Sequence, residues 1–204
     1  MIRKSMRLRF TMAVLLLIGA GCAAQRGPDT RMTATPAGPV CRIAVLPFSN
    51  DAKQPQAGLA AFRIFMGEMM GTGRFQIIPE GEVHMFLTRN RLRPGDLWDT
   101  VHYAEFASQF GADVLIRGKV ADCAVVTVHE AGNIPQLAMQ VEMVEAGTGR
   151  ILLSTFHRRK GDDYRKTMHF GIIHTLSELM AQVSREIAED WYEKGIQGCP
   201  SGKK

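Results

Sequence analysis

The amphipathic segment near the end of the chain constrains the fold most strongly, because its apolar stripe needs a broad surface to pack on. Apolar side chains recur there at helical spacing from about Asp163 to Lys194, with charged residues in the positions between them. The stripe consists of Met168, Ile172, Leu176, Leu179, Met180, Val183, Ile187 and Trp191. We therefore expect one long C-terminal helix that packs on a β-sheet formed by earlier segments.

Five earlier segments have the patterns of β-strands. The first, "RIAVLPF", holds a short apolar run closed by Pro47, which is typical of a strand buried on both faces. The segment "QLAMQVEMVE" alternates apolar and polar residues, and "AGTG" after it predicts a hairpin turn. The remaining three strand segments are "RFQIIPE", "ADVLIRGKVADCAVVTV" and "RILLSTF".

Apolar residues at helical spacing also separate the first three strand segments. The resulting order is β-α-β-α-α-β-β-β-α. It predicts an α/β fold with a mixed sheet of about five strands, early parallel β-α crossovers, a late antiparallel hairpin and the long C-terminal helix packed on the sheet, in two or three layers.

The N-terminus has the pattern of a lipoprotein signal peptide over residues 1–21. Four basic residues precede an apolar run of about eleven residues, which is too short to cross a bilayer, and small residues then lead to Cys22. Cys22 resembles the acylated cysteine of bacterial lipoproteins, although Gly19 stands where that motif usually has Leu. A plain signal peptide cut near Ala24 is the alternative. Acylation of Cys22, including a palmitate-type chain, would anchor the mature protein without a membrane span.

We expect three further parts after the signal peptide. Residues 22–40 contain three prolines and no hydrophobic period, and they predict a flexible tether that spans roughly 60 Å when extended. Residues 41–199 predict a single domain, and residues 200–204 a tail.

Of 25 basic residues four leave with the signal, so 21 remain against 20 acidic residues, a formal charge of +1. This balance gives no reason to expect nucleic acid as a partner.

Four motifs in order resemble the CsgG and TolB-amino-terminal-like superfamily. They are "RIAVLPFSN", "GTGRFQIIPEGEV", "FGADVLIRGKV" and "VEAGTGRILLST". Small lipoproteins of this superfamily include PelC-like export proteins and LpoB-like activators of peptidoglycan synthases. The resemblance covers core and turn residues, so it implies a fold and a class of envelope protein but no catalytic residues.

The resemblance and the signal peptide together imply a lipoprotein on the periplasmic face of the outer membrane of a Gram-negative bacterium. We expect a non-enzymatic accessory of an export or secretion system, which oligomerises or docks on partner proteins. The alternative is an LpoB-like regulator that binds and activates a periplasmic cell-wall enzyme. No cofactor is implied, and His169 and His174, five residues apart on one segment, do not indicate a metal site.

Two exposed-looking features are candidates for contact with a partner or with lipid. His157, Arg158, Arg159 and Lys160 form a basic cluster after the last strand, which we interpret as a solvated loop or as a contact for anionic lipid or a polyanionic partner. Trp98 lies in a connection between helices, where it either packs locally or serves as a contact aromatic.

Three cysteines remain after Cys22, and an envelope location permits a disulfide. The predicted topology returns the C-terminal helix to the edge of the sheet where the first strand begins, which places Cys199 beside Cys41. Cys123 lies near the far end of the long strand, out of reach of Cys41. Because three is an odd number, one thiol stays free or pairs between chains. The alternative for Cys199 is a frayed tail without a bond.

Overall fold

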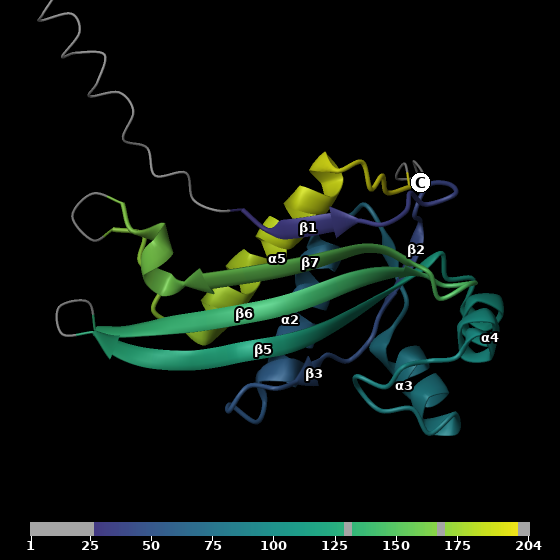
Figure 1. Ribbon diagram of the computed structural model, residues 1–204, viewed down its shortest axis with the longest axis horizontal. Coiled ribbons are helices and arrows are strands. Elements are labelled where there is room, and N and C mark those ends of the chain that lie inside the picture. The colour runs from purple at the N-terminus through teal and green to yellow at the C-terminus, as the bar shows by residue number, and fades with distance from the viewer. Residues whose placement is uncertain (1–26, 129–131, 167–169, 200–204) are drawn as a thin grey trace, which may run out of the picture.

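The computed structural model describes residues 27–128, 132–166 and 170–199, and these form a seven-stranded mixed sheet with four α-helices (Figure 1). The strands are β1 (Asp29–Met32), β2 (Arg42–Val45), β3 (Ser49–Asn50), β4 (Gln76–Ile77), β5 (Val114–Val128), β6 (Gly132–Glu145) and β7 (Ile151–Lys160). The helices are α2 (Ala57–Gly71), α3 (Glu80–Arg89), α4 (Thr100–Phe110) and α5 (Leu176–Glu193), with a short 3-10 helix η1 (Gly161–Tyr164) after β7.

β2 is the centre of the parallel part of the sheet. It pairs with β4 and β5 in parallel, so that Ile43 lies opposite both Ile77 and Val114. Ile43 and Ala44 are fully buried on opposite faces, as the continuous apolar run predicts. The strand order is β1-β7-β6-β5-β2-β4, and β3 pairs in parallel with β5.

β5, β6 and β7 form a long antiparallel meander, and β1 adds to its free edge beside β7. The β6–β7 turn depends on Gly149, which has a φ of +74°. A Cβ atom at this position would lie only 2.5 Å from the Tyr103 ring, so both the backbone conformation and the packing against α4 require glycine there.

The larger core lies between one face of the sheet and the helices α2 and α5. Trp191 of α5 is buried against Phe65 of α2, with their ring centroids 6.0 Å apart. The inward positions of β6 complete this layer, with Leu137, Met139 and Val141 all fully buried. The stripe of α5 is thus covered by the sheet and by α2 together.

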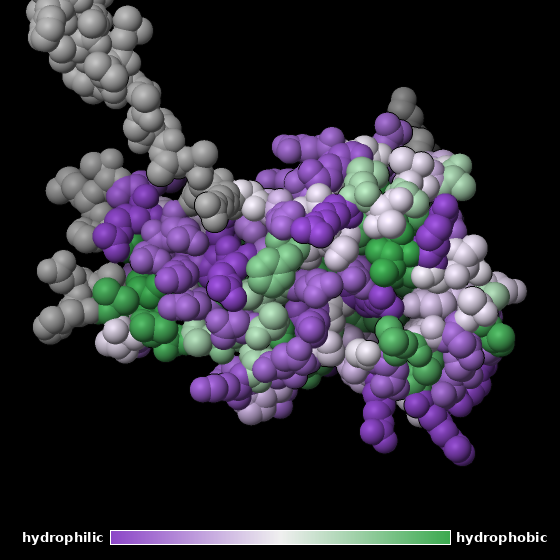
Figure 2. All heavy atoms as spheres, in the orientation of Figure 1, coloured by the Kyte–Doolittle hydropathy of each residue, from purple (hydrophilic) through white to green (hydrophobic). Residues whose placement is uncertain are grey.

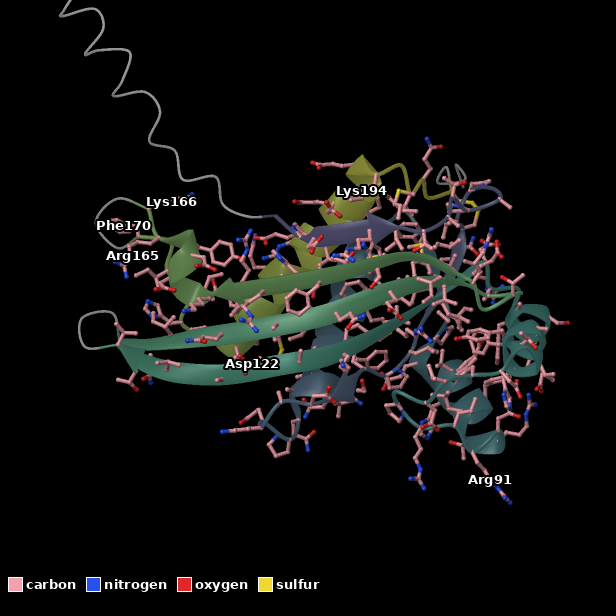
Figure 3. All side chains as sticks on the ribbon, in the orientation of Figure 1. Arg91, Asp122, Arg165, Lys166, Phe170 and Lys194 are labelled. Carbon is pink, nitrogen blue, oxygen red and sulfur yellow. A yellow bond between two sulfur atoms is a disulfide. The ribbon has the colours of Figure 1, made fainter. Side chains whose placement is uncertain are left out.

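The helices α3 and α4 cover the opposite face of the sheet, but only at one end. Their core includes Phe86 and Phe106, which pack edge to face at 4.9 Å, together with Leu115 from the outward face of β5. The protein therefore has three layers at this end and two layers at the other, where none of the described helices covers this second face of β5, β6 and β7 (Figure 1). Arg91 marks the α3 end and Phe170 the opposite end (Figure 3).

The sequence prediction of a mixed α/β fold with a C-terminal helix is confirmed, but the sheet has seven strands and not about five. β1 lies within the segment expected as a flexible tether, and β3 within an expected loop. Helix α5 begins at Leu176 instead of near Asp163, because η1 and a turn at Gly171 occupy the residues between. None of the described helices is long and apolar enough to cross a membrane.

Candidate functional site

The basic cluster at residues 157–160 belongs to β7 and is not a solvated loop. Strand alternation directs His157 and Arg159 into the protein, where they are 2% and 7% exposed, while Arg158 and Lys160 stay exposed on the other face. The expectation of a solvated loop was therefore wrong, since four basic residues adjacent in sequence separate into a buried pair and an exposed pair.

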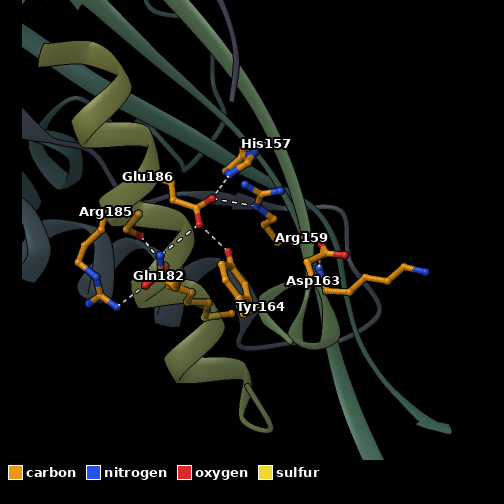
Figure 4. Close-up of polar contacts among 10 residues, drawn as sticks. His157, Arg159, Asp163, Tyr164, Gln182, Arg185 and Glu186 are labelled. Carbon is orange, nitrogen blue, oxygen red and sulfur yellow. Dashed lines mark hydrogen bonds and ion pairs between the residues drawn. The ribbon is translucent and has the colours of Figure 1, made fainter. Parts of the chain in front are cut away.

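The buried pair contacts Glu186 of α5 (Figure 4). One carboxylate oxygen, Oε2, receives hydrogen bonds from Arg159 Nε at 2.9 Å and from the His157 ring. The other, Oε1, receives hydrogen bonds from the Tyr164 hydroxyl at 2.8 Å and from Gln182 Nε2 at 3.1 Å. The four donors come from β7, η1 and α5, so this carboxylate holds three elements together.

The pKa values in this cluster follow from burial and from these bonds. Burial by itself raises the pKa of the Glu186 carboxyl, but the four donated hydrogen bonds outweigh it and lower the pKa to about 2. Burial and the hydrogen bond to this carboxylate both raise the pKa of the Tyr164 hydroxyl. A carboxylate that stays ionised, with both oxygens occupied by donors, is suited to a structural role and not to proton transfer near neutral pH.

An open cleft lies beside this cluster, between the end of β7, η1 and the start of α5. Its lining includes the cations Arg158, Lys160, Arg165 and Lys166, all exposed, with Arg159 on the buried side. Within the described part of the chain none of the four exposed cations forms an ion pair. They have solvated charges available for an anionic surface or ligand.

Three carboxylates also line the cleft. Asp163 accepts a hydrogen bond from the backbone N–H of Lys160 at 2.8 Å. Glu178 lies in the first turn of α5, where the helix dipole favours a negative charge. Asp29 of β1 is the third. Arg159 is paired with Glu186, so four exposed cations face these three carboxylates, and the cleft has a small excess of positive charge.

Trp98 is placed in an aromatic cluster of α3 and α4. Its ring centroid lies 5.5 Å from that of Phe86 and 5.3 Å from that of Tyr103, and the side chain is half-buried. A shallow hollow beside it contains the ion pair from Arg117 Nε to Glu142 Oε2, at 2.6 Å. The structure thus gives Trp98 a packing role, and contact with a partner through it stays a prediction.

The structure describes three of the four cysteines. Cys22 lies outside the described residues. Cys41 and Cys199 are joined by a disulfide, with their Cα atoms 4.8 Å apart. Cys123 is a buried free thiol, and burial, followed by the nearby Asp122 charge, raises its pKa, which disfavours the reactive thiolate.

Metal ligation has no candidate within the described ranges, where no group of three or more His, Cys, Asp or Glu side chains is placed to hold an ion. His174 instead lies 3.4 Å from the backbone oxygen of Asn133 through its Nδ1 atom.

The sequence reasoning missed the most connected residue of the site, Glu186, and the cations Arg165 and Lys166. The period-2 pattern of β7 continues through His157 and Arg159, which could have indicated that these two side chains point inward. Their partner on α5 is 27 residues beyond Arg159, and no local pattern indicates that contact.

No protein-family model and no curated protein sequence matches this chain. Its fold, however, matches solved structures. PelC from Paraburkholderia phytofirmans, described as a dodecamer, superimposes with a TM-score of 0.54 at 17% identity, over 85% of this chain and 99% of PelC. Lipoprotein GNA1162 from Neisseria meningitidis superimposes with a TM-score of 0.50 at 12% sequence identity. The match covers 75% of this chain and 99% of the GNA1162 chain.

The C-terminal domain of LpoB from Salmonella enterica gives a TM-score of 0.46 at 16% identity, over 62% of this chain and 87% of that domain, a similarity too low to support an argument. The PelC and GNA1162 matches agree with the fold that the sequence resemblance implies, whereas the CsgG and TolB-amino-terminal-like assignment stays a prediction. At these identities the comparison establishes a shared architecture: this chain has the fold of PelC and of lipoprotein GNA1162.

Proposed function

We propose that this protein is a non-enzymatic accessory of an envelope export system, anchored through an acylated Cys22 on the periplasmic face of the outer membrane, and that it works as a homo-oligomer. The observation that carries the proposal is the superposition on PelC, in which 99% of the PelC chain has a counterpart here. PelC is described as a dodecamer, and PelC-like proteins are export accessories, so both properties are proposed for this chain by analogy of fold.

The exposed apolar side chains over α3 and α4 support self-association. Met85 of α3, Leu97 of the connection and Val101 of α4 are 65%, 84% and 69% exposed. Figure 2 shows hydrophobic atoms gathered over this part of the surface. Large apolar side chains grouped in this way mark an interaction surface, and for a PelC-like fold a second copy of the chain is the partner that we propose.

The mass of the assembly tests the proposal. We expect the mature chain without its acyl group to elute as a multi-subunit oligomer in size-exclusion chromatography with light scattering. Leu97→Glu should lower the measured mass toward that of the monomer, because the new charge would lie within the apolar surface. The fold should not be affected, since the exposed Leu97 side chain contributes little to the core. Met70→Glu, an exposed position at the end of α2, serves as the matched control and should leave the mass unchanged.

A monomer at every protein concentration would contradict the assembly proposal. The sequence-based alternative, a monomeric regulator of a cell-wall enzyme, would then be tested by direct binding to periplasmic peptidoglycan synthases.

A further inference from the structure

The chain enters the folded body at the rim of the basic cleft. Gly27 and Asp29 both line this cleft, and β1 fixes them there because Asp29 pairs with Phe156 of β7. The described chain thus begins beside β7 on the side of η1, well inside the end formed by the β5–β6 tip (Figure 1).

The pairing of β1 shortens the connection to the anchor. Cys22 is five residues before Gly27, and five residues span at most about 18 Å. The roughly 60 Å that residues 22–40 would reach as a free tether is therefore not available while β1 is paired. If Cys22 is acylated, which is part of the proposed function, the cleft end of the protein must lie close to the lipid surface.

This end presents four exposed cations to an anionic lipid surface, against the three carboxylates Asp29, Asp163 and Glu178 that line the same cleft. We call it the basic end and define it by Arg158, Lys160, Arg165, Lys166 and Phe170. The four cations are exposed and form no ion pair among the described residues, so no ion pair has to break when they meet lipid phosphates. Cations near an anionic membrane surface each contribute about 1 kcal/mol, which is roughly fivefold in partitioning.

Apolar side chains lie at the same end. Phe170, 74% exposed, is placed close to Arg165 and Lys166 in Figure 3. At the β5–β6 tip, Val125 and Val128 are 49% and 41% exposed, and Figure 2 shows hydrophobic atoms there next to hydrophilic ones. Basic residues interspersed with exposed aromatic and aliphatic side chains are typical of surfaces that bind the membrane interface.

We propose that the basic end docks on the anionic surface of the membrane that holds the anchor, with its four cations on lipid headgroup phosphates and Phe170 at the interface. The lipid chain and this surface then act as two membrane signals on one side of the protein. The α3 and α4 surface lies at the opposite end, and so it points away from the membrane and stays available for assembly.

Vesicle co-sedimentation of the mature chain made without an acyl group tests this docking. That chain retains every element described above, and the vesicles contain phosphatidylcholine alone or mixed with a large fraction of phosphatidylglycerol. We expect binding only to the anionic vesicles, and loss of this binding at high salt. The double variant Arg165→Ala with Lys166→Ala should bind about thirtyfold more weakly, from about 1 kcal/mol for each cation.

The matched control removes the same charge elsewhere, with Lys53→Ala in the β3–α2 connection and Arg93→Ala in the α3–α4 connection. It should change binding by less than about twofold, since these charges lie away from the docked surface. Phe170→Trp gives a second readout, because its emission should shift to the blue on anionic vesicles only. Circular dichroism of each variant shows that it is folded.

Equal loss of binding in the control double variant, or equal binding to neutral vesicles, would overturn the docking proposal. The acyl group is absent from this experiment, so a negative result here is distinct from a failure of acylation at Cys22, which is measured by labelling in cells.

Discussion

Trp191 donates a hydrogen bond from its indole Nε1 to the Thr155 hydroxyl oxygen over 2.7 Å, in the centre of the larger core. The same hydroxyl lies 2.7 Å from the Thr30 hydroxyl of β1. Two hydrogen bonds in series therefore connect α5, β7 and β1. The strand that fixes the entry of the chain is in this way attached to the helix that completes the core.

We expect Thr155→Val to destabilise the protein by about 1 to 3 kcal/mol, because it keeps the shape but leaves the buried indole N–H of Trp191 without an acceptor. Urea unfolding measures this difference. Thr155→Ser is the control, since it retains the hydroxyl and should cost about 1 kcal/mol for the lost methyl group. A larger loss for serine than for valine would show that the hydrogen bond is unimportant.

Glu186→Gln should lower the free energy of unfolding at neutral pH by on the order of 3 kcal/mol, because the buried Arg159 loses its anionic partner. The wild-type carboxyl has a folded pKa of about 2, below its ordinary value of 4.5. Its contribution is therefore complete above pH 4.5 and is lost as the pH falls toward 2.

The measurement is the stability difference between wild type and Glu186→Gln across this pH range, and the difference should shrink with acidity. Glu189→Gln changes an exposed carboxylate on the same helix and should have little effect at any pH. A difference that stays constant down to pH 2 would contradict the assignment.

Cys199→Ser should lower stability by up to about 5 kcal/mol, because the bond to Cys41 closes a loop of 158 residues and restricts the unfolded chain. Reductant should destabilise the wild type by a similar amount and leave the variant unchanged. In non-reducing peptide mapping, the Cys41 and Cys199 peptides should appear linked, and Cys123 should be alkylated only after unfolding. Full alkylation of Cys199 without reductant would rule out the bond.

Cells fed a palmitate analogue should label the wild-type protein, whereas Cys22→Ala should lose both the label and the membrane fractionation, because the acyl chain is the proposed anchor. Cys123→Ala should keep both, since its thiol is buried in the core. Equal labelling of Cys22→Ala and the wild type would end the lipoprotein interpretation.

The sequence predicted correctly the elements in which a regular spacing of apolar residues extends over many positions. The alternation of β6 and the apolar stripe of α5 each extend over many residues, and both elements appear with their expected faces buried. β1 and β3 were missed because they are short and polar. They are held by backbone pairing to β7 and β5, and such pairing depends on partners far along the chain.

The candidate site was predictable only in part, for a related reason. The basic composition of residues 157–160 is visible in the sequence, and so is the alternation that buries two of them. The carboxylate that accepts hydrogen bonds from this pair lies on α5, and the cations that join the other two follow η1. Tertiary packing brings these segments together.

The bridge between Cys41 and Cys199 makes the chain between them a closed covalent ring. A protease that cuts one peptide bond anywhere inside this ring produces a nicked molecule whose two fragments stay attached to each other. The segment between Cys22 and Gly27 lies outside the ring, so one cut there would separate the intact body from the proposed anchor at Cys22. Proteolysis at these two kinds of site thus has opposite results, retention of a nicked protein in one case and release of a whole one in the other.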